Sequence, residues 1–298
     1  MSPLDLQQRL AALSSRETPV EDREAEDRKG FPQGNELSRF AYLGHIHSLE
    51  ERRAGPKTQD VFDRLAQLAE PEDWAGPKPP HASDMGVLQH YLTWRFERAI
   101  QEERVIPDAE SQLCVFNTGL ATRRQESIYA LFKPNFRPDR QPWCLEGWYL
   151  EGDRQLDSFP ELPDPPAYSD EPCDYIFDRR LPLAMKPRDV VQMRIDKFPE
   201  ELRHDRYGLE LRLTAAVDRA MKMAARNYTT AVPMWYSVTE EVRLALPLSL
   251  TEPGEFDSAL AIYRVRDRYR VGTVLSLTGA YYDARLLARP TAPWLNPN

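Results

Sequence analysis

Cysteine is scarce in this 298-residue chain, which contains only three. Cys114, Cys144 and Cys173 are widely spaced, with no Cys-x-x-Cys pair and no histidine near them. The odd count and loose spacing argue against a disulfide framework and against a zinc site. We therefore expect reduced thiols, as in a cytosolic protein.

Long apolar runs are also absent. No stretch approaches the roughly 18 consecutive apolar residues that a membrane-spanning helix needs. The opening residues, Met1–Asp5, have neither the basic region nor the apolar region of a signal peptide. We therefore expect a cytoplasmic protein with no membrane partner.

Common catalytic and cofactor motifs are missing as well. The chain has no Walker loop, no Gly-x-Gly-x-x-Gly, no His-Glu-x-x-His and no Gly-x-Ser-x-Gly. The five histidines are scattered, and His45 and His47 would not share a helical face. Strand alternation would put Glu146 and Glu151 on opposite faces, so they do not form an acid–base pair. We expect neither a metal site nor a cofactor.

Negative charge is in excess, with a formal net charge of −8 and a pI of about 5.3. The molecule as a whole therefore repels phosphate backbones. Any binding of nucleic acid must depend on a local basic patch.

The order of the segments predicts an α+β protein. Residues 1–35 read as a short amphipathic helix over 4–13, followed by a polar linker. Residues 36–105 read as a helical segment packed on the main domain, and 106–298 as an α+β domain that carries the candidate site. We expect a mainly antiparallel sheet with one inserted helix, preceded by an N-terminal helical segment.

The apolar spacing places the individual elements. It predicts helices over 40–49, 61–68, 84–103, 208–226 and 279–287. Short aromatic and β-branched segments between 113 and 150 predict strands, as do 242–250, 259–265 and 269–277. The last two strands flank a tight turn at Arg266-Asp267-Arg268 and predict a hairpin. The proline-rich segment 157–172 is expected to be a surface loop.

The first candidate site begins at Asn117-Thr118-Gly119, which follows an apolar segment that ends at Phe116. The Asn amide and the Thr hydroxyl can donate hydrogen bonds to a phosphate or a base edge. Arg123 follows nearby, and Tyr129 and Lys133 would share one face of the next strand. The alternative reading is a plain Asn-Thr-Gly turn between strands.

A second candidate is the helix expected over 208–226. Its apolar residues fall in one arc, and a separate arc carries Arg212, Arg219, Lys222 and Arg226. Asn227 and Tyr228 follow the helix. Four cations on one face suit a phosphate or a polyanion. The alternative is a solvated helix face whose cations favour the helix C-terminus.

The C-terminal stretch 264–289 is rich in arginine. Arg264, Arg266, Arg268 and Arg270 would crowd the tip of the expected hairpin, and Arg285 and Arg289 follow. Tyr281, Tyr282 and Trp294 add aromatic groups. Single-stranded nucleic acid and nucleotides favour such mixtures of cations and rings.

Separated motifs in a fixed order carry a family resemblance. They are Pro71-Glu72-Asp73-Trp74, Phe116-Asn117-Thr118-Gly119-Leu120 with Ile128–Phe132, Arg226-Asn227-Tyr228, Leu246–Leu250, Ala280-Tyr281 with Ala284-Arg285-Leu286, and Trp294-Leu295. From about Phe62 to Leu295 the chain resembles the bacterial domain-of-unknown-function family numbered thirty-eight twenty-five, whose members are sometimes joined to RNA-binding modules.

This resemblance implies nucleotide or RNA handling. It also implies that Asn117, Arg226, Asn227, Tyr228 and Arg285 line one site. Asp283 departs from the family pattern, where an Asn is expected, and a carboxylate there would weaken a phosphate contact.

Three hypotheses follow, which differ in class. The first is a nucleotide- or RNA-binding domain whose candidate ligands are Asn117, Thr118, Arg123, Tyr129, Lys133, Lys222, Arg226, Asn227, Tyr228 and Arg285. The second is an enzyme that acts on a phosphoester or nucleotide through Glu146 or Asp283. The third is a protein-interaction module that binds a partner or a second copy of the chain through residues 4–13.

Overall fold

The computed structural model describes residues 36–43, 58–76, 85–108, 110, 112–137 and 141–295. The chain forms two compact units: unit 1 comprises Met1–Gly76 and Ala82–Ala167, and unit 2 comprises Pro77–His81 and Tyr168–Asn298. The helix expected over 4–13 and the linker over 14–35 lie outside the described residues. The boundaries expected at 35/36 and 105/106 stay a prediction.

Unit 1 is built on a five-stranded sheet, sheet A, with the strand order β1-β5-β4-β3-β2. Strands β1 and β5 run parallel, and the other neighbours are antiparallel. In chain order the elements are α3 (Glu36–Phe40), β1 (Ala41–Tyr42), α5 (Thr58–Leu68), α6 (Gly86–Gln101), β2 (Val105–Pro107), β3 (Cys114–Ala121), β4 (Ser127–Pro134), β5 (Trp143–Leu150) and the 3₁₀ turn η1 (Arg154–Leu156).

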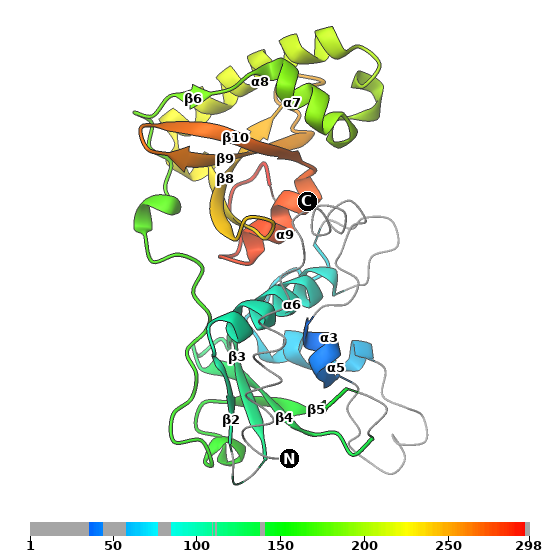
Figure 1. The fold of residues 1–298 in the computed structure, drawn as a ribbon, viewed down its shortest axis with the longest axis vertical. Coiled ribbons are helices and arrows are strands. Elements are labelled where there is room, and N and C mark those ends of the chain that lie inside the picture. Colours follow the sequence, from blue (N-terminus) through cyan, green and yellow to red (C-terminus); the bar gives the residue numbers. More distant parts are fainter. Residues whose placement is uncertain are drawn as a thin grey trace. The chain divides into compact units, whose positions relative to one another are not determined.

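Helix α6 confirms the helix expected over 84–103, although Asp84 itself lies outside the described residues. Its whole expected apolar face is buried. The Phe96 ring lies 4.9 Å from the Phe40 ring and 5.2 Å from the Phe116 ring, between centroids. Each fully buried side chain of this size contributes about 1.5–3 kcal/mol. This aromatic cluster holds α6 and α3 on one side of sheet A (Figure 1).

The helix expected over 40–49 is wrong in its described part. Helix α3 ends at Phe40, where the helix was expected to begin, and Ala41 and Tyr42 pair with β5. The side chains of Phe40 and Ala41 are both buried. The apolar spacing at residues 40 and 41 therefore reflects core positions on α3 and β1. Residues 44–49 lie outside the described part.

The second face of sheet A is covered by the segment that follows β5. Leu156 and Phe159 pack on Val115, Tyr129 and Leu131 from β3 and β4. The segment 157–172 is therefore more than the expected surface loop, because its first part closes a sheet face. Strands β3 and β4 are buried on both faces as a result.

Unit 2 contains a second five-stranded sheet, sheet B, with the order β6-β10-β9-β8-β7. Only the β6–β10 pair is parallel. The elements are η2 (Pro172–Asp174), β6 (Leu183–Ala184), α7 (Pro187–Arg194), η3 (Ile195–Lys197), η4 (Glu200–Leu202), α8 (Arg206–Arg226), η5 (Tyr228–Thr230), β7 (Val232–Tyr236), β8 (Glu241–Leu248), β9 (Ser258–Val265), β10 (Arg268–Leu275) and α9 (Leu277–Arg285).

Helix α8 confirms the helix expected over 208–226, and its predicted apolar arc is buried against β8 and β9. The Asp205 carboxylate caps its first turn by accepting from the Gly208 N–H at 2.9 Å. Figure 1 shows α7 and α8 over one face of sheet B and α9 against the other. The β9–β10 hairpin forms as expected, with Arg266 and Asp267 between the strands.

The α+β class is confirmed, and the strands divide between two mainly antiparallel sheets. Among the residues that the structure describes, no helix is both long and apolar enough to cross a membrane.

His90 is a half-buried ionisable residue of unit 1. It lies on α6, and neither ring nitrogen is accessible to solvent. Burial disfavours the charged imidazolium and lowers the pKa of His90 from its ordinary 6.5 to about 3.

This burial predicts a pH dependence of stability. Between pH 6.5 and about 3 the unfolded state binds the His90 proton and the folded state does not. The stability that the neutral ring provides is therefore present above pH 6.5 and lost as pH falls. We expect wild type to lose up to about 1.4 kcal/mol per pH unit more than His90→Gln across this window.

Chemical denaturation at several pH values measures the difference. His204→Gln, which alters an exposed histidine of unit 2, serves as the control and should follow wild type. Parallel pH curves for wild type and His90→Gln would contradict the prediction.

Candidate functional site

The ten candidate residues divide between the two units. Asn117, Thr118, Arg123, Tyr129 and Lys133 belong to unit 1, whereas Lys222, Arg226, Asn227, Tyr228 and Arg285 belong to unit 2. The expectation that residues of both groups line one site stays a prediction.

Asn117 and Thr118 lie inside strand β3, so the expectation that a strand ends before them is wrong. The Asn117 amide donates to the Pro163 carbonyl at 2.9 Å, and its Oδ1 accepts from the Gly119 N–H at 2.9 Å. The Thr118 hydroxyl donates to the Ile128 carbonyl at 2.6 Å. Both side chains are buried. Their polar groups stabilise an irregular strand.

The irregularity is a bulge in β3 between Asn117 and Ala121. Gly119 has φ +70°, a conformation that L side chains rarely adopt. A Cβ at this position would lie 2.8 Å from the Tyr91 hydroxyl and 3.2 Å from the Arg95 Cζ. Helix α6 therefore packs directly on the backbone of the bulge.

Tyr129 lies beside Asn117 across the β3–β4 ladder. Both line a cavity of about 590 Å³ whose other walls include Glu151, Asp153 and Asp164. Burial, and then the charge of Glu151, raises the pKa of Tyr129 above its ordinary value. A neutral phenol among carboxylates does not suit a phosphate group.

Lys133 forms an ion pair with Glu146 of β5. One pair thus joins the lysine expected to hold phosphate and the carboxylate considered as an acid–base group. Across a β-ladder such a pair compensates both charges. The arrangement favours a structural role for Lys133 and Glu146.

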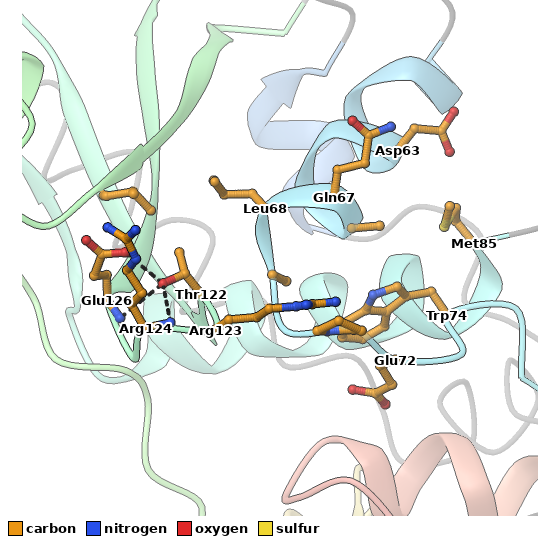
Figure 2. A pocket seen from close by; sticks show the side chains of 14 residues that line it. Asp63, Gln67, Leu68, Glu72, Trp74, Met85, Thr122, Arg123, Arg124 and Glu126 are labelled. Atoms are coloured by element: carbon orange, nitrogen blue, oxygen red, sulfur yellow. Dashed lines mark hydrogen bonds between the residues drawn. The ribbon is translucent and has the colours of Figure 1, made fainter.

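Arg123 lies at a larger cavity of about 850 Å³ (Figure 2). Its walls come from α5, the segment after α5 and the turn between β3 and β4. Apolar lining includes Leu68, Trp74 and Met85. The remaining polar and charged lining residues are Asp63, Gln67, Glu72, Thr122, Arg124 and Glu126.

The β3–β4 turn that presents Arg123 and Arg124 is held by its own hydrogen bonds. The Thr122 hydroxyl donates to the Glu126 carboxylate at 2.8 Å and accepts from the Arg124 N–H at 3.2 Å (Figure 2). The Glu70 N–H donates to the Ala121 carbonyl at 2.8 Å, and the Gln125 amide donates to the Glu70 carboxylate at 2.6 Å. These bonds fix the turn against the end of α5.

The two arginines are the exposed cations of this cavity. Among the described residues, neither guanidinium makes a hydrogen bond or an ion pair. The Glu126 carboxylate, in contrast, is engaged by Thr122. The cavity thus offers guanidinium donors, carboxylate acceptors and an apolar wall. Sequence reasoning selected Arg123 but not Gln67 or Met85, whose positions depend on how α5 and α6 pack.

The cations of α8 divide into two groups. Arg212 donates to the Leu250 carbonyl at 3.1 Å and Arg219 to the Ser249 carbonyl at 2.8 Å, which fastens the helix to the segment after β8. Lys222 pairs with Asp218 at 2.6 Å, and the Arg226 Nε donates to the Lys222 carbonyl at 3.2 Å. Arg226 stays exposed.

The residues after α8 act as a cap. Asn227 Oδ1 accepts from the Thr229 N–H at 3.2 Å and from its hydroxyl at 2.7 Å. Tyr228 is 62% exposed, whereas Arg285 is buried in α9. Lys222, Arg226, Asn227 and Tyr228 are therefore the members of the unit 2 group that face solvent.

No group of three or more His, Cys, Asp or Glu residues that could hold a metal ion occurs within the described ranges.

Fold and site together define an α+β protein of two units with an arginine-rimmed cavity in the first. The family model described as "Domain of unknown function (DUF3825)" matches residues 65–294, which is most of the chain. The chain therefore belongs to the DUF3825 family, and the resemblance stated from its motifs is confirmed. Searches of curated proteins and of solved structures gave no match.

The close approach of α6 to β3 predicts a stability effect at Gly119. Gly119→Ala should cost about 1–2 kcal/mol for the positive φ and about 1–3 kcal/mol for the overlap with Tyr91 and Arg95. Chemical denaturation measures the total.

Gly152→Ala is the matched control. Gly152 has φ +90°, but a Cβ there would have no neighbour within 4 Å. This variant should show the backbone cost alone. Equal losses for the two variants would mean that α6 does not press on the bulge.

Proposed function

We propose that the protein binds a nucleotide, or the end of a single-stranded RNA, in the unit 1 cavity beside Arg123 and Arg124. The observation that carries this proposal is a pair of exposed arginines on a fixed turn, with no intramolecular partner among the described residues, at a cavity of about 850 Å³. Small-molecule sites commonly measure about 300–1,000 Å³.

The chemistry of the lining matches the parts of a nucleotide. Guanidinium groups bind phosphate with charge-assisted, often bidentate, hydrogen bonds. Glu72 and Asp63 provide carboxylate oxygens that can accept from ribose hydroxyls or from base amino groups. Leu68 and Met85 provide an apolar wall for a base. A nucleotide has a phosphate, ribose hydroxyls and a planar base, so it can contact the guanidinium groups, the carboxylates and the apolar wall.

The turn geometry supports tight binding because it is already ordered. The bonds of Thr122, Gln125 and Glu70 hold the backbone of the turn without a ligand. Less conformational entropy is then lost on binding. Lys133 is paired with Glu146. We therefore assign the phosphate contacts to Arg123 and Arg124 instead of Lys133. In unit 2, Lys222, Arg226 and Tyr228 remain candidates for a separate contact.

Removal of the two arginines tests the proposal. The double variant Arg123→Ala/Arg124→Ala should weaken nucleotide binding about tenfold or more, because a hydrogen bond to a charged group contributes about 1.5–3 kcal/mol. Isothermal titration calorimetry with ribonucleoside monophosphates measures the loss. The matched control Arg137→Ala/Arg154→Ala removes the same charge from exposed positions of unit 1 away from the cavity.

A comparison of nucleotide with nucleoside locates the phosphate. Wild type should bind the nucleoside more weakly than the nucleotide, and the double variant should bind both about equally. Unchanged nucleotide affinity in Arg123→Ala/Arg124→Ala, or an equal loss in the control, would contradict the proposal.

A further inference from the structure

Sheet B contains a buried arginine on the face opposite α7 and α8. Arg243 of β8 is 6% exposed, and its guanidinium pairs with the Glu241 carboxylate at 2.7 Å. Its Cζ lies 3.8 Å from the centre of the Tyr236 ring and 5.0 Å from that of Tyr263. A Cβ at Gly272 would overlap its Nη1. The Arg243 guanidinium therefore occupies the space that a side chain at position 272 would need.

The strand register extends this contact across the sheet. Tyr236, Arg243 and Tyr263 lie on the adjacent strands β7, β8 and β9, and Tyr263 pairs with Arg270 of β10. Paired residues of an antiparallel ladder project from the same face. Tyrosine and arginine thus alternate over four neighbouring strands. We call this set the tyrosine–arginine row.

Further positive charge lies at the open end of the row. Arg268 pairs with Val265, so it projects from the same face as Arg270, two residues away. Both arginines are exposed, and Tyr263 is half-buried. In the part of the chain that the structure describes, the Arg270 side chain makes no hydrogen bond or ion pair.

The nearby carboxylates cancel only part of this charge. Asp267 offsets one arginine, Arg268, with which it pairs at 3.1 Å. Glu241 is held by the buried Arg243. Segment 264–270 carries four arginines against one aspartate in a chain of net charge −8. The local excess favours an anionic partner.

We propose that the tyrosine–arginine row binds single-stranded nucleic acid. Arg268 and Arg270 contact neighbouring phosphates, and Tyr263 stacks on a base. Stacking on an aromatic side chain tolerates any base, because every base has a π face. Arg243 is a positioning residue that supports the Tyr263 ring from behind. The inference uses unit 2 alone, so it does not depend on nucleotide binding in unit 1.

Fluorescence anisotropy with labelled oligouridine RNA, over a range of salt concentrations, tests this surface. Arg268→Ala/Arg270→Ala should bind about tenfold more weakly at low salt. The slope of log K against log salt should fall in magnitude by about 1.4, about 0.7 for each lost phosphate contact. Tyr263→Leu should weaken binding about tenfold, whereas Tyr263→Phe should bind as wild type does, because it keeps the ring.

The matched control is Arg188→Ala/Arg206→Ala, which removes two exposed arginines from α7 and α8 on the opposite face of sheet B. The control should keep wild-type affinity. Single-stranded DNA of the same length shows whether the ribose hydroxyl contributes.

Three results would overturn the proposal. They are unchanged RNA affinity in Arg268→Ala/Arg270→Ala, an equal loss in the control, and competition by polyglutamate as effective as competition by unlabelled RNA. The last result would indicate an acidic protein partner. Arg268→Ala/Arg270→Ala should weaken oligouridine binding by the same factor when Arg123→Ala/Arg124→Ala is already present, which separates failure at this surface from failure at the unit 1 cavity.

Discussion

Helix α6 reaches the backbone of β3 because residue 119 has no side chain. The phenol of Tyr91 and the guanidinium of Arg95 occupy the space that a Cβ would need. Arg95 continues to the Pro166 carbonyl at 2.7 Å, and Asn117 donates to the Pro163 carbonyl at 2.9 Å. The helix, the bulged strand and the segment 163–166 are therefore tied at one place.

The unit 1 cavity depends on this arrangement. After the bulge, Ala121 pairs with Ser127 of β4, and the turn 122–126 lies between these two residues. The Glu70 N–H then binds the Ala121 carbonyl, which fixes the turn to the end of α5. Arg123 and Arg124 are thus displayed at a cavity lined by α5. The buried motif Asn117-Thr118-Gly119 in β3 thus supports the exposed arginines Arg123 and Arg124 in the turn that follows it.

Buried and exposed arginines have different roles in this protein. A buried guanidinium loses its solvation and needs compensation by charge and hydrogen bonds. Arg243 obtains it from Glu241, from the Thr239 hydroxyl at 3.0 Å and from two tyrosine rings. Arg123, Arg124 and Arg270 are exposed and have no such compensation within the described residues. Exposed arginines of this second kind can exchange water for a ligand phosphate.

Periodicity predicted the elements with strong local signals. The apolar arcs of α6 and α8 and the turn at Arg266-Asp267 were readable because each depends on nearby residues. The roles of polar side chains could not be read from the sequence, because their hydrogen-bond and ion-pair partners are distant along the chain. The sequence marks Asn117 as a candidate ligand residue but does not show that its amide binds the Pro163 carbonyl. It marks Lys133 as a candidate phosphate contact but does not show that the β4–β5 ladder brings Glu146 to it.

The same limit applies to the cavity. Arg123 was visible as an exposed donor in a turn, and Trp74 belongs to a motif that carries the family resemblance. That these residues share a cavity with Gln67 and Met85 depends on the packing of α5 and α6, which no local pattern specifies.

Hydrogen–deuterium exchange with and without a saturating nucleotide shows whether the ligand binds in the unit 1 cavity. We expect slower exchange in two segments of unit 1, 66–74 and 122–126, which line the cavity. Exchange in unit 2 should be unchanged by a mononucleotide. Slower exchange confined to the residues around Arg226 and Tyr228, or no change anywhere in the presence of nucleotide, would contradict the account.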